Sequence, residues 1–105
     1  MTFAILKKRL GLPAGSEPYW HRHVNRLANG TTSEGGWVEN TAFVAPTVIV
    51  GVNAIVGHKA RLEGNVRIDD YAVVAGNVLI TGDVRIAGKA VATGTSRKAL
   101  ETRGP

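Results

Sequence analysis

Residues 51–92 read GVNAIVGHKARLEGNVRIDDYAVVAGNVLITGDVRIAGKAVA, and apolar residues recur in this stretch every six positions. The same spacing extends back to Trp37. One series contains ten aliphatic residues: Val38, Val44, Val50, Val56, Leu62, Ile68, Val74, Ile80, Ile86 and Ala92. A second series, two positions earlier in each unit, contains nine small apolar residues: Ala42, Val48, Ala54, Ala60, Val66, Ala72, Val78, Val84 and Ala90. A chain that is 44% hydrophobic would not keep these 19 positions free of polar side chains by chance.

A period of six fits neither a helix, which repeats every 3.6 residues, nor a continuous strand, which repeats every 2. It fits short strands that are separated by turns. The two marked residues of each unit are two positions apart, so they point to the same side of one strand. Gly, Asn and Asp between the units tolerate the positive φ of a sharp corner, as in Glu63-Gly64-Asn65 and Thr81-Gly82-Asp83.

The runs GVNAIVG, EGNVRID, AGNVLIT and TGDVRIA resemble the hexapeptide-repeat family, which forms a left-handed parallel β-helix. The resemblance covers residues 37–92. It implies that three six-residue units form one triangular coil, and that the chain is an all-β protein of about three coils. The left hand of the winding is implied by the resemblance, because the general rule for parallel crossovers favours the right hand.

If three units form a coil, residues 18 apart stack on one outer face. Face one then carries Phe43, Arg61 and Leu79, face two carries Ile49, Arg67 and Arg85, and face three carries Ile55, Val73 and Val91. Face three has only apolar outward residues, so either a neighbouring subunit or the chain's own N-terminal segment should cover it. The resemblance implies a homotrimer with face three at its interface. The alternative is that Val and Ile on this face reflect β-propensity alone.

The chain ends do not follow the six-residue pattern, so we divide the chain into an N-terminal arm or cap (1–36), the repeat body (37–92) and a C-terminal tail (93–105). Thr2–Leu10 is expected to form a short helix that Gly11 and Pro13 end. Ser16–Ala28 is expected to form a second helix, because Trp20, Val24 and Leu27 would share one face. Residues 29–36 (NGTTSEGG) are expected to be a linker.

The net charge of +5 on 105 residues is concentrated in the two ends. Residues 1–36 contain five basic and two acidic residues (+3), residues 37–92 contain five of each (0), and residues 93–105 contain three and one (+2). The candidate partner-binding residues are Lys7, Lys8, Arg9, Arg22, Arg26, Arg97, Lys98 and Arg103. The absence of Cys excludes disulfides and thiol chemistry, and we expect no membrane span and no signal peptide.

Many hexapeptide-repeat proteins are acyltransferases, and the resemblance implies that a His between subunits would act as the general base. His58 is the only histidine of the repeat body, but three coils leave little wall for an acyl-donor groove. Other members resemble γ-class carbonic anhydrases with a three-histidine zinc site, yet His21 and His23 lie outside the repeat. Asp69-Asp70 fits a solvated turn as well as a cation site. We therefore expect no metal and no cofactor.

The runs GNVRI, GNVLI and GDVRI, after GGWVENTAFVAP, are similar to small phage-encoded and bacterial hexapeptide-repeat proteins that lack a catalytic apparatus. We therefore expect a non-enzymatic structural protein, a trimer whose basic ends dock onto a larger acidic assembly. The most concrete version is a phage capsid decoration or cement protein, located in the virion if phage-encoded and otherwise in the cytoplasm. The alternatives are an acyltransferase-like enzyme that uses His58, and non-specific nucleic-acid binding by the arms.

Overall fold

The computed structural model describes residues 1–92 and 95–96. It contains one α-helix, one short 3-10 helix and twelve strands in that part of the chain. Their bounds are α1 (Phe3–Leu10), η1 (Glu17–Tyr19), β1 (Trp20–Arg26), β2 (Thr32–Glu39), β3 (Phe43–Val44), β4 (Ile49–Val50), β5 (Ile55–Val56), β6 (Arg61–Leu62), β7 (Arg67–Ile68), β8 (Val73–Val74), β9 (Asn77–Ile80), β10 (Arg85–Ile86), β11 (Val91–Ala92) and β12 (Thr95–Ser96). The predicted all-β fold is confirmed.

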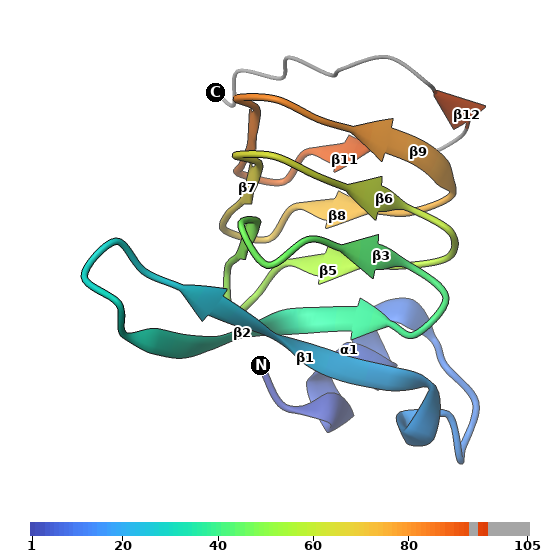
Figure 1. The fold of residues 1–105 in the computed structure, drawn as a ribbon. Helices are drawn as coiled ribbons and strands as arrows, with labels where there is room; N and C mark the ends of the chain where they lie inside the picture. The colour runs from blue at the N-terminus through green and yellow to red at the C-terminus, as the bar shows by residue number, and fades with distance from the viewer. Residues whose placement is uncertain (93–94, 97–105) are drawn as a thin grey trace.

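The strands from β3 onward wind into a parallel β-solenoid of about three turns (Figure 1). Each turn contributes one short strand to each of three sheets, which have the orders β12-β9-β6-β3, β10-β7-β4 and β1-β2-β5-β8-β11. Residues 18 apart pair in register, as Phe43 with Arg61 and Ile55 with Val73. The predicted composition of the three faces is therefore confirmed.

The interior of the solenoid is a column of aliphatic side chains. Fifteen of the 19 repeat positions are buried in one core cluster, and the other four, Ala42, Val44, Ala90 and Ala92, pack against it partly buried. No aromatic side chain enters this column among the described residues. A triangular cross-section closed by short strands accommodates Val, Ile, Leu and Ala because their volumes fill it at the density of a protein interior.

The corners use backbone conformations with positive φ. Gly64 has φ +81°, and a Cβ atom there would come within 2.9 Å of the Gly82 nitrogen in the next coil. Glycine at this corner therefore serves both the turn and the close stacking of coils. Among the described residues, two other than glycine, His58 and Asp70, also adopt the left-handed conformation, each with φ 58°.

The N-terminal segment is partly as expected. The helix at the start is confirmed as α1, with the Thr2 side chain accepting the Ile5 N–H at its N-terminus and Gly11 in the left-handed conformation after its end. The second helix, expected over Ser16–Ala28, is wrong. Residues 20–26 form β1, which pairs antiparallel with β2, and the expected linker 29–36 contains the turn and most of β2. β2 also crosses the boundary that we placed between residues 36 and 37.

The β1–β2 hairpin closes the end of the solenoid at which β3, β4 and β5 lie, and its tip projects to one side (Figure 1). At this end the backbone groups of β4 face away from β7 and need other partners. The Asn25 side chain supplies two of them, since Nδ2 donates to the Val50 carbonyl at 2.9 Å and Oδ1 accepts the Val50 N–H at 2.9 Å. His23 Nε2 lies 2.7 Å from the Val48 carbonyl, which can only accept, so Nε2 carries the proton. Two buried polar side chains therefore take the place of a neighbouring strand.

Candidate functional surfaces and the corner at His58

The first candidate surface is face three, which is covered unevenly. Ile55 is 1% exposed, in a second hydrophobic cluster with Leu6 of α1, Trp20 and Trp37. Its cover is therefore the chain's own N-terminal segment, one of the two alternatives that the sequence left open. Val73 is half-buried at the border of this cluster, and Val91 is 65% exposed. The exposed apolar part of face three thus lies toward the end of the solenoid that is farther from the hairpin.

The basic residues of the N-terminal segment divide into two groups. Arg9 and Arg22 bind within the chain. Arg9 donates to the Asn53 carbonyl at 2.6 Å and to the Tyr71 carbonyl at 3.2 Å, and it joins α1 to two corners of the solenoid. Arg22 stacks over the Trp37 ring and donates to the Met1 carbonyl at 2.6 Å and to Glu34 at 3.0 Å. These two residues hold the cap on the solenoid.

The remaining basic residues of the N-terminal segment are available to a partner to different degrees. Lys8 and Arg26 are exposed, and Lys7 is half-buried. The expected tail residues Arg97, Lys98 and Arg103 lie outside the described residues. The sequence predicted that all eight basic residues bind a partner. A count of charges does not show which of these side chains instead bind a carbonyl or an aromatic ring of the chain itself.

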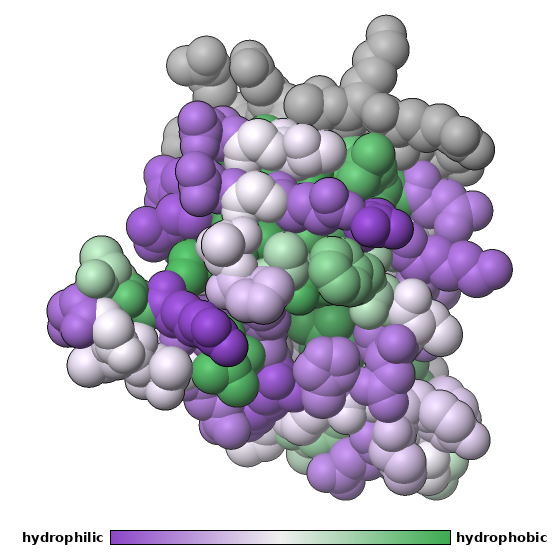
Figure 2. Space-filling model, in the orientation of Figure 1, coloured by the Kyte–Doolittle hydropathy of each residue, from purple (hydrophilic) through white to green (hydrophobic). Residues whose placement is uncertain are grey.

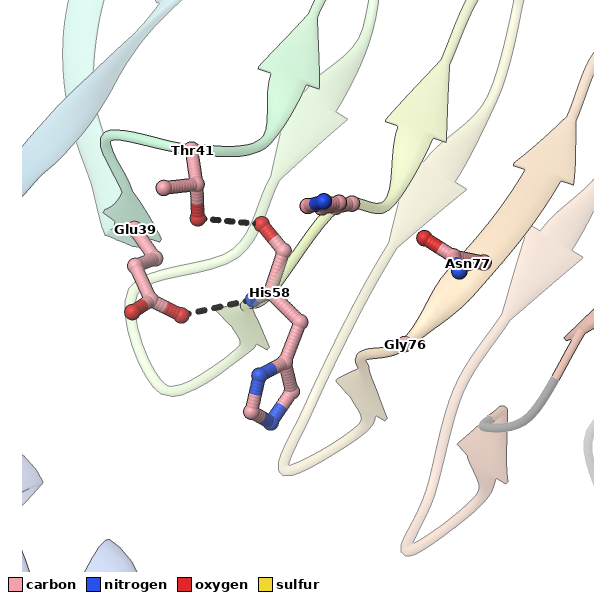
Figure 3. A pocket seen from close by; sticks show the side chains of 6 residues that line it. Glu39, Thr41, His58, Gly76 and Asn77 are labelled. Carbon is pink, nitrogen blue, oxygen red and sulfur yellow. Dashed lines mark hydrogen bonds between the residues drawn. The ribbon is translucent and has the colours of Figure 1, made fainter.

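A hollow of about 550 Å³ opens at the corner between face three and face one. Figure 3 shows that its lining residues come from three successive levels of the stack: Glu39 and Thr41, then His58, then Gly76 and Asn77. Glu39 Oε1 accepts the His58 backbone N–H at 2.6 Å, and the Thr41 hydroxyl donates to the His58 carbonyl. A smaller apolar hollow of about 230 Å³ adjoins it, with Trp20, Ile55 and Val73 in its wall.

The contacts at this corner hold the backbone of His58 and leave its ring free. The imidazole is exposed and points away from the Glu39 and Thr41 side chains (Figure 3). Within the described part of the chain, no side chain donates to or accepts from this ring. A general base is usually oriented by a second group, and this corner provides no such group for His58.

The two histidines of β1 lie in different environments because a bulge between Arg22 and Val24 shifts the register of the strand. His21 is exposed, and its Nδ1 lies 2.7 Å from Asn40 Oδ1. His23 is buried beside β4. Residues 1–92 contain no group of three or more His, Cys, Asp or Glu side chains that could hold a metal ion.

The environment of His23 predicts a pH-dependent stability. Burial lowers the pKa of His23 below its ordinary value of 6.5; the Val48 hydrogen bond opposes this effect, and the charge of His21 adds to it. Well above pH 6.5 both the folded and unfolded forms are neutral at this residue. Below it the unfolded chain takes up the proton first, so the free energy of unfolding should fall, by at most about 1.4 kcal/mol per pH unit.

Urea unfolding between neutral and mildly acidic pH measures this effect. The matched variant is His23→Gln, whose side-chain amide can donate to the Val48 carbonyl but does not titrate. We expect the variant to lose most of the acid-induced decrease, whereas His21→Gln should retain it. An equal pH slope in wild type and His23→Gln would contradict the assignment.

Face two carries a row of charged side chains. Asp69 is largely buried, and its Oδ2 lies 2.9 Å from Arg85 Nε and 3.4 Å from Arg67 Nε. This carboxylate raises the pKa of Arg85 above its ordinary value, so Arg85 stays charged. Asp70 Oδ2 accepts the Gly88 N–H at 2.9 Å. Both carboxylates of the Asp69-Asp70 pair are therefore used within the protein.

Face one combines apolar and charged surface. Phe43 is 49% exposed, and the Arg61 guanidinium lies 5.1 Å from the centre of its ring while also pairing with Glu63. Figure 2 shows apolar surface over β3 and near β9, bordered by hydrophilic side chains. The apolar surface of this face is therefore interrupted by charges.

Comparison of the chain with protein-family models, with curated proteins and with solved structures gives no match. The structure itself defines the class of protein: an all-β chain that forms a short parallel β-solenoid, with a hairpin and a helix packed at one end. No helix in the described residues is both long and apolar enough to cross a membrane.

Proposed function

We propose that the chain is a non-enzymatic structural protein that forms a homotrimer and docks onto a larger acidic assembly, most concretely a phage capsid as a decoration or cement protein. The observation that carries the proposal is the distribution of charge over the fold. A neutral repeat body is flanked by basic ends, and among the described residues the side chains of Lys7, Lys8 and Arg26 make no hydrogen bond or ion pair that holds the cap. A stiff solenoid would keep these charges at fixed positions, and three copies would add avidity.

The trimer part of the proposal rests on the uncovered portion of face three. Val91 is 65% exposed although it stacks in register on Val73 and Ile55. An exposed Val at the end of an apolar row favours contact with another protein surface. Ile55 is unsuitable as a probe of this contact, because its substitution would disturb the chain's own cluster beneath α1.

Replacing Val91 by Glu is therefore expected to convert trimers to monomers without unfolding the chain. A buried, unpaired carboxylate is costly at an interface but is solvated in a free subunit. Sedimentation and circular dichroism measure the two effects separately. The control is Val52→Glu, which places the same charge at an exposed Val in a corner and should leave the trimer intact. A Val91→Glu trimer of wild-type stability, or a wild-type chain that sediments as a monomer, would contradict the trimer assignment.

The docking part of the proposal needs its own test. A variant with Lys7, Lys8 and Arg26 replaced by Gln is expected to lose association with capsid shells or another large acidic assembly, while the trimer remains. Co-sedimentation with the particle measures this. Equal association of wild type and variant would contradict docking through the N-terminal end.

The hollow beside His58 favours a second candidate function, an acyltransferase-like enzyme. Glu39, Lys59 and Asn77 line it together with His58, and the adjoining apolar hollow offers room for part of an acyl chain. Calorimetry with an acyl-CoA, followed by comparison of wild type with His58→Ala, tests this function. Tight binding and an activity that the substitution abolishes would replace the structural proposal.

A third candidate function is non-specific nucleic-acid binding by the basic ends. It predicts an affinity for generic duplex DNA that falls steeply as the salt concentration rises. The projecting hairpin carries Arg26 but exposes Val24 and Leu27 beside it, so this end presents a mixed surface and not a continuous basic track.

A further inference from the structure

The two arginines of face two are held as a pair by one carboxylate. Arg67 and Arg85 are partners in the parallel β7–β10 ladder, so their side chains leave the sheet in register on neighbouring strands, about 4.8 Å apart. Both direct their Nε atoms to Asp69 Oδ2. The Asp69 side chain is 15% exposed, whereas those of Arg67 and Arg85 are 60% and 64% exposed. We call Arg67, Arg85 and Asp69 the arginine clamp.

The carboxylate does two things for this pair. It compensates part of the repulsion between two guanidinium groups that stand on adjacent strands. It also accepts the Arg85 Nε–H at 2.9 Å and attracts the Arg67 guanidinium, whose Nε lies 3.4 Å from the same oxygen. Within the described residues the terminal Nη atoms of both arginines make no hydrogen bond to the protein. The terminal nitrogens of each arginine are thereby left toward solvent, and the three side chains of the clamp carry a net charge of +1.

We propose that the arginine clamp binds a carboxylate side chain of an acidic protein partner. The two arginines rise from neighbouring strands and pair with the same Asp69 oxygen, so their terminal nitrogens can reach the two oxygens of one carboxylate. Charge-assisted bonds of this kind are stronger than neutral ones. Because Asp69 hydrogen-bonds Arg85 and pairs with Arg67, part of the side-chain freedom is already lost before binding. This inference rests on the proposed docking function and names a surface for it outside the basic ends.

The rest of face two favours a protein over a nucleic acid. The third outward residue of the face is Ile49, which is half-buried and stacks in register on Arg67. An apolar residue beside an arginine anchor is the composition of a protein interface. Nucleic-acid grooves combine a longer track of cations with aromatic platforms, and the outward positions of face two contain no aromatic residue.

The test uses a fluorescently labelled oligoglutamate peptide and fluorescence anisotropy at low salt. The double variant Arg67→Gln/Arg85→Gln is expected to bind the peptide about tenfold or more weakly than wild type. The matched control is Arg61→Gln, which removes an equally exposed outward arginine that is paired with Glu63 on face one. We expect the control to change the affinity by less than about twofold. Circular dichroism verifies that each variant is folded.

Four outcomes would overturn the inference: no binding of the peptide by wild type, undiminished binding by the double variant, an equal loss in the control and the double variant, or tighter binding of a single-stranded oligonucleotide through Arg67 and Arg85. The variant with Lys7, Lys8 and Arg26 replaced by Gln separates this inference from the proposed function. If that variant loses the particle while the arginine-clamp variant keeps both the particle and the peptide, the docking function stands and the clamp assignment is wrong.

Discussion

Replacing Gly36 by Ala is expected to lower the free energy of unfolding by about 3 kcal/mol or more. β2 passes so close to the first coil that a Cβ atom at Gly36 would lie less than 3.0 Å from the carbonyl oxygens of Gly51 and Ala54. Both are backbone atoms, and the Gly51 carbonyl also accepts the Ala54 N–H of the corner turn at 2.9 Å. Neither can move without opening the corner or the β2–β5 pairing.

This loss is a large fraction of the total stability, because a chain of this size is stabilised by only about 5–15 kcal/mol. In a thermal melt it should lower Tm by more than about 10 °C. Gly57→Ala is the matched control, since a Cβ atom there would meet the Glu39 carboxylate and the Trp20 ring at 3.4 and 3.5 Å, which is ordinary contact. We expect the control to melt within a few degrees of wild type. Equal melting temperatures for the two variants would show that β2 does not approach the coil as described.

Replacing Asn25 by Ala is expected to lower the free energy of unfolding by about 2–5 kcal/mol. The substitution removes the only side chain among the described residues that pairs with both the N–H and the carbonyl of Val50. Asn25 is 5% exposed, so water cannot readily replace the amide. Each unpaired buried backbone group costs about 1–3 kcal/mol. Urea unfolding measures the loss, and hydrogen exchange should locate it at the Val50 amide.

The control for Asn25 is Asn65→Ala. Asn65 is an exposed corner residue whose Nδ2 donates to Asp83 at 3.0 Å, so its loss should cost less than about 0.5 kcal/mol. If Asn25→Ala is as stable as Asn65→Ala, the hairpin does not close the edge of β4 through this side chain.

The sequence alone was sufficient for the solenoid because its core is periodic. Every six-residue unit contains an aliphatic residue and a small apolar residue two positions apart. The ladder partners 18 residues apart, such as Ile49 with Arg67, follow from that period together with the three units per coil that the hexapeptide-repeat resemblance implies. The outward residues of all three faces could therefore be predicted correctly.

The N-terminal hairpin could not be predicted in the same way, because its stability depends on contacts that no local pattern shows. The spacing of Trp20, Val24 and Leu27 fits a helix, yet the buried residues of β1 include His23 and Asn25, and Val24 is exposed. Their partners are the backbone groups of Val48 and Val50, 25 positions away at and just before β4. Gly35 and Gly36 were the available signal, since a glycine pair before an apolar residue also marks a close approach of two backbones.

For the candidate surfaces too, the sequence predicted which residues belong together, and the tertiary structure decided which of them are exposed. The sequence identified Ile55, Val73 and Val91 as one apolar row, and tertiary structure decided that α1 covers Ile55 and leaves Val91 exposed. It identified the basic residues of the N-terminal segment, and tertiary structure decided that Arg9 and Arg22 bind the solenoid while Lys8 and Arg26 face solvent.

The sequence by itself determined the series of short strands and the distribution of charge, because a six-residue period is a local property of each unit and its neighbours. The register of 18 residues followed once the family resemblance supplied three units per coil. Only tertiary structure decided how the chain ends are used. The hydrogen-bonding groups at the end of a parallel stack have no partner within the repeat, and the side chains that satisfy them come from a segment outside it.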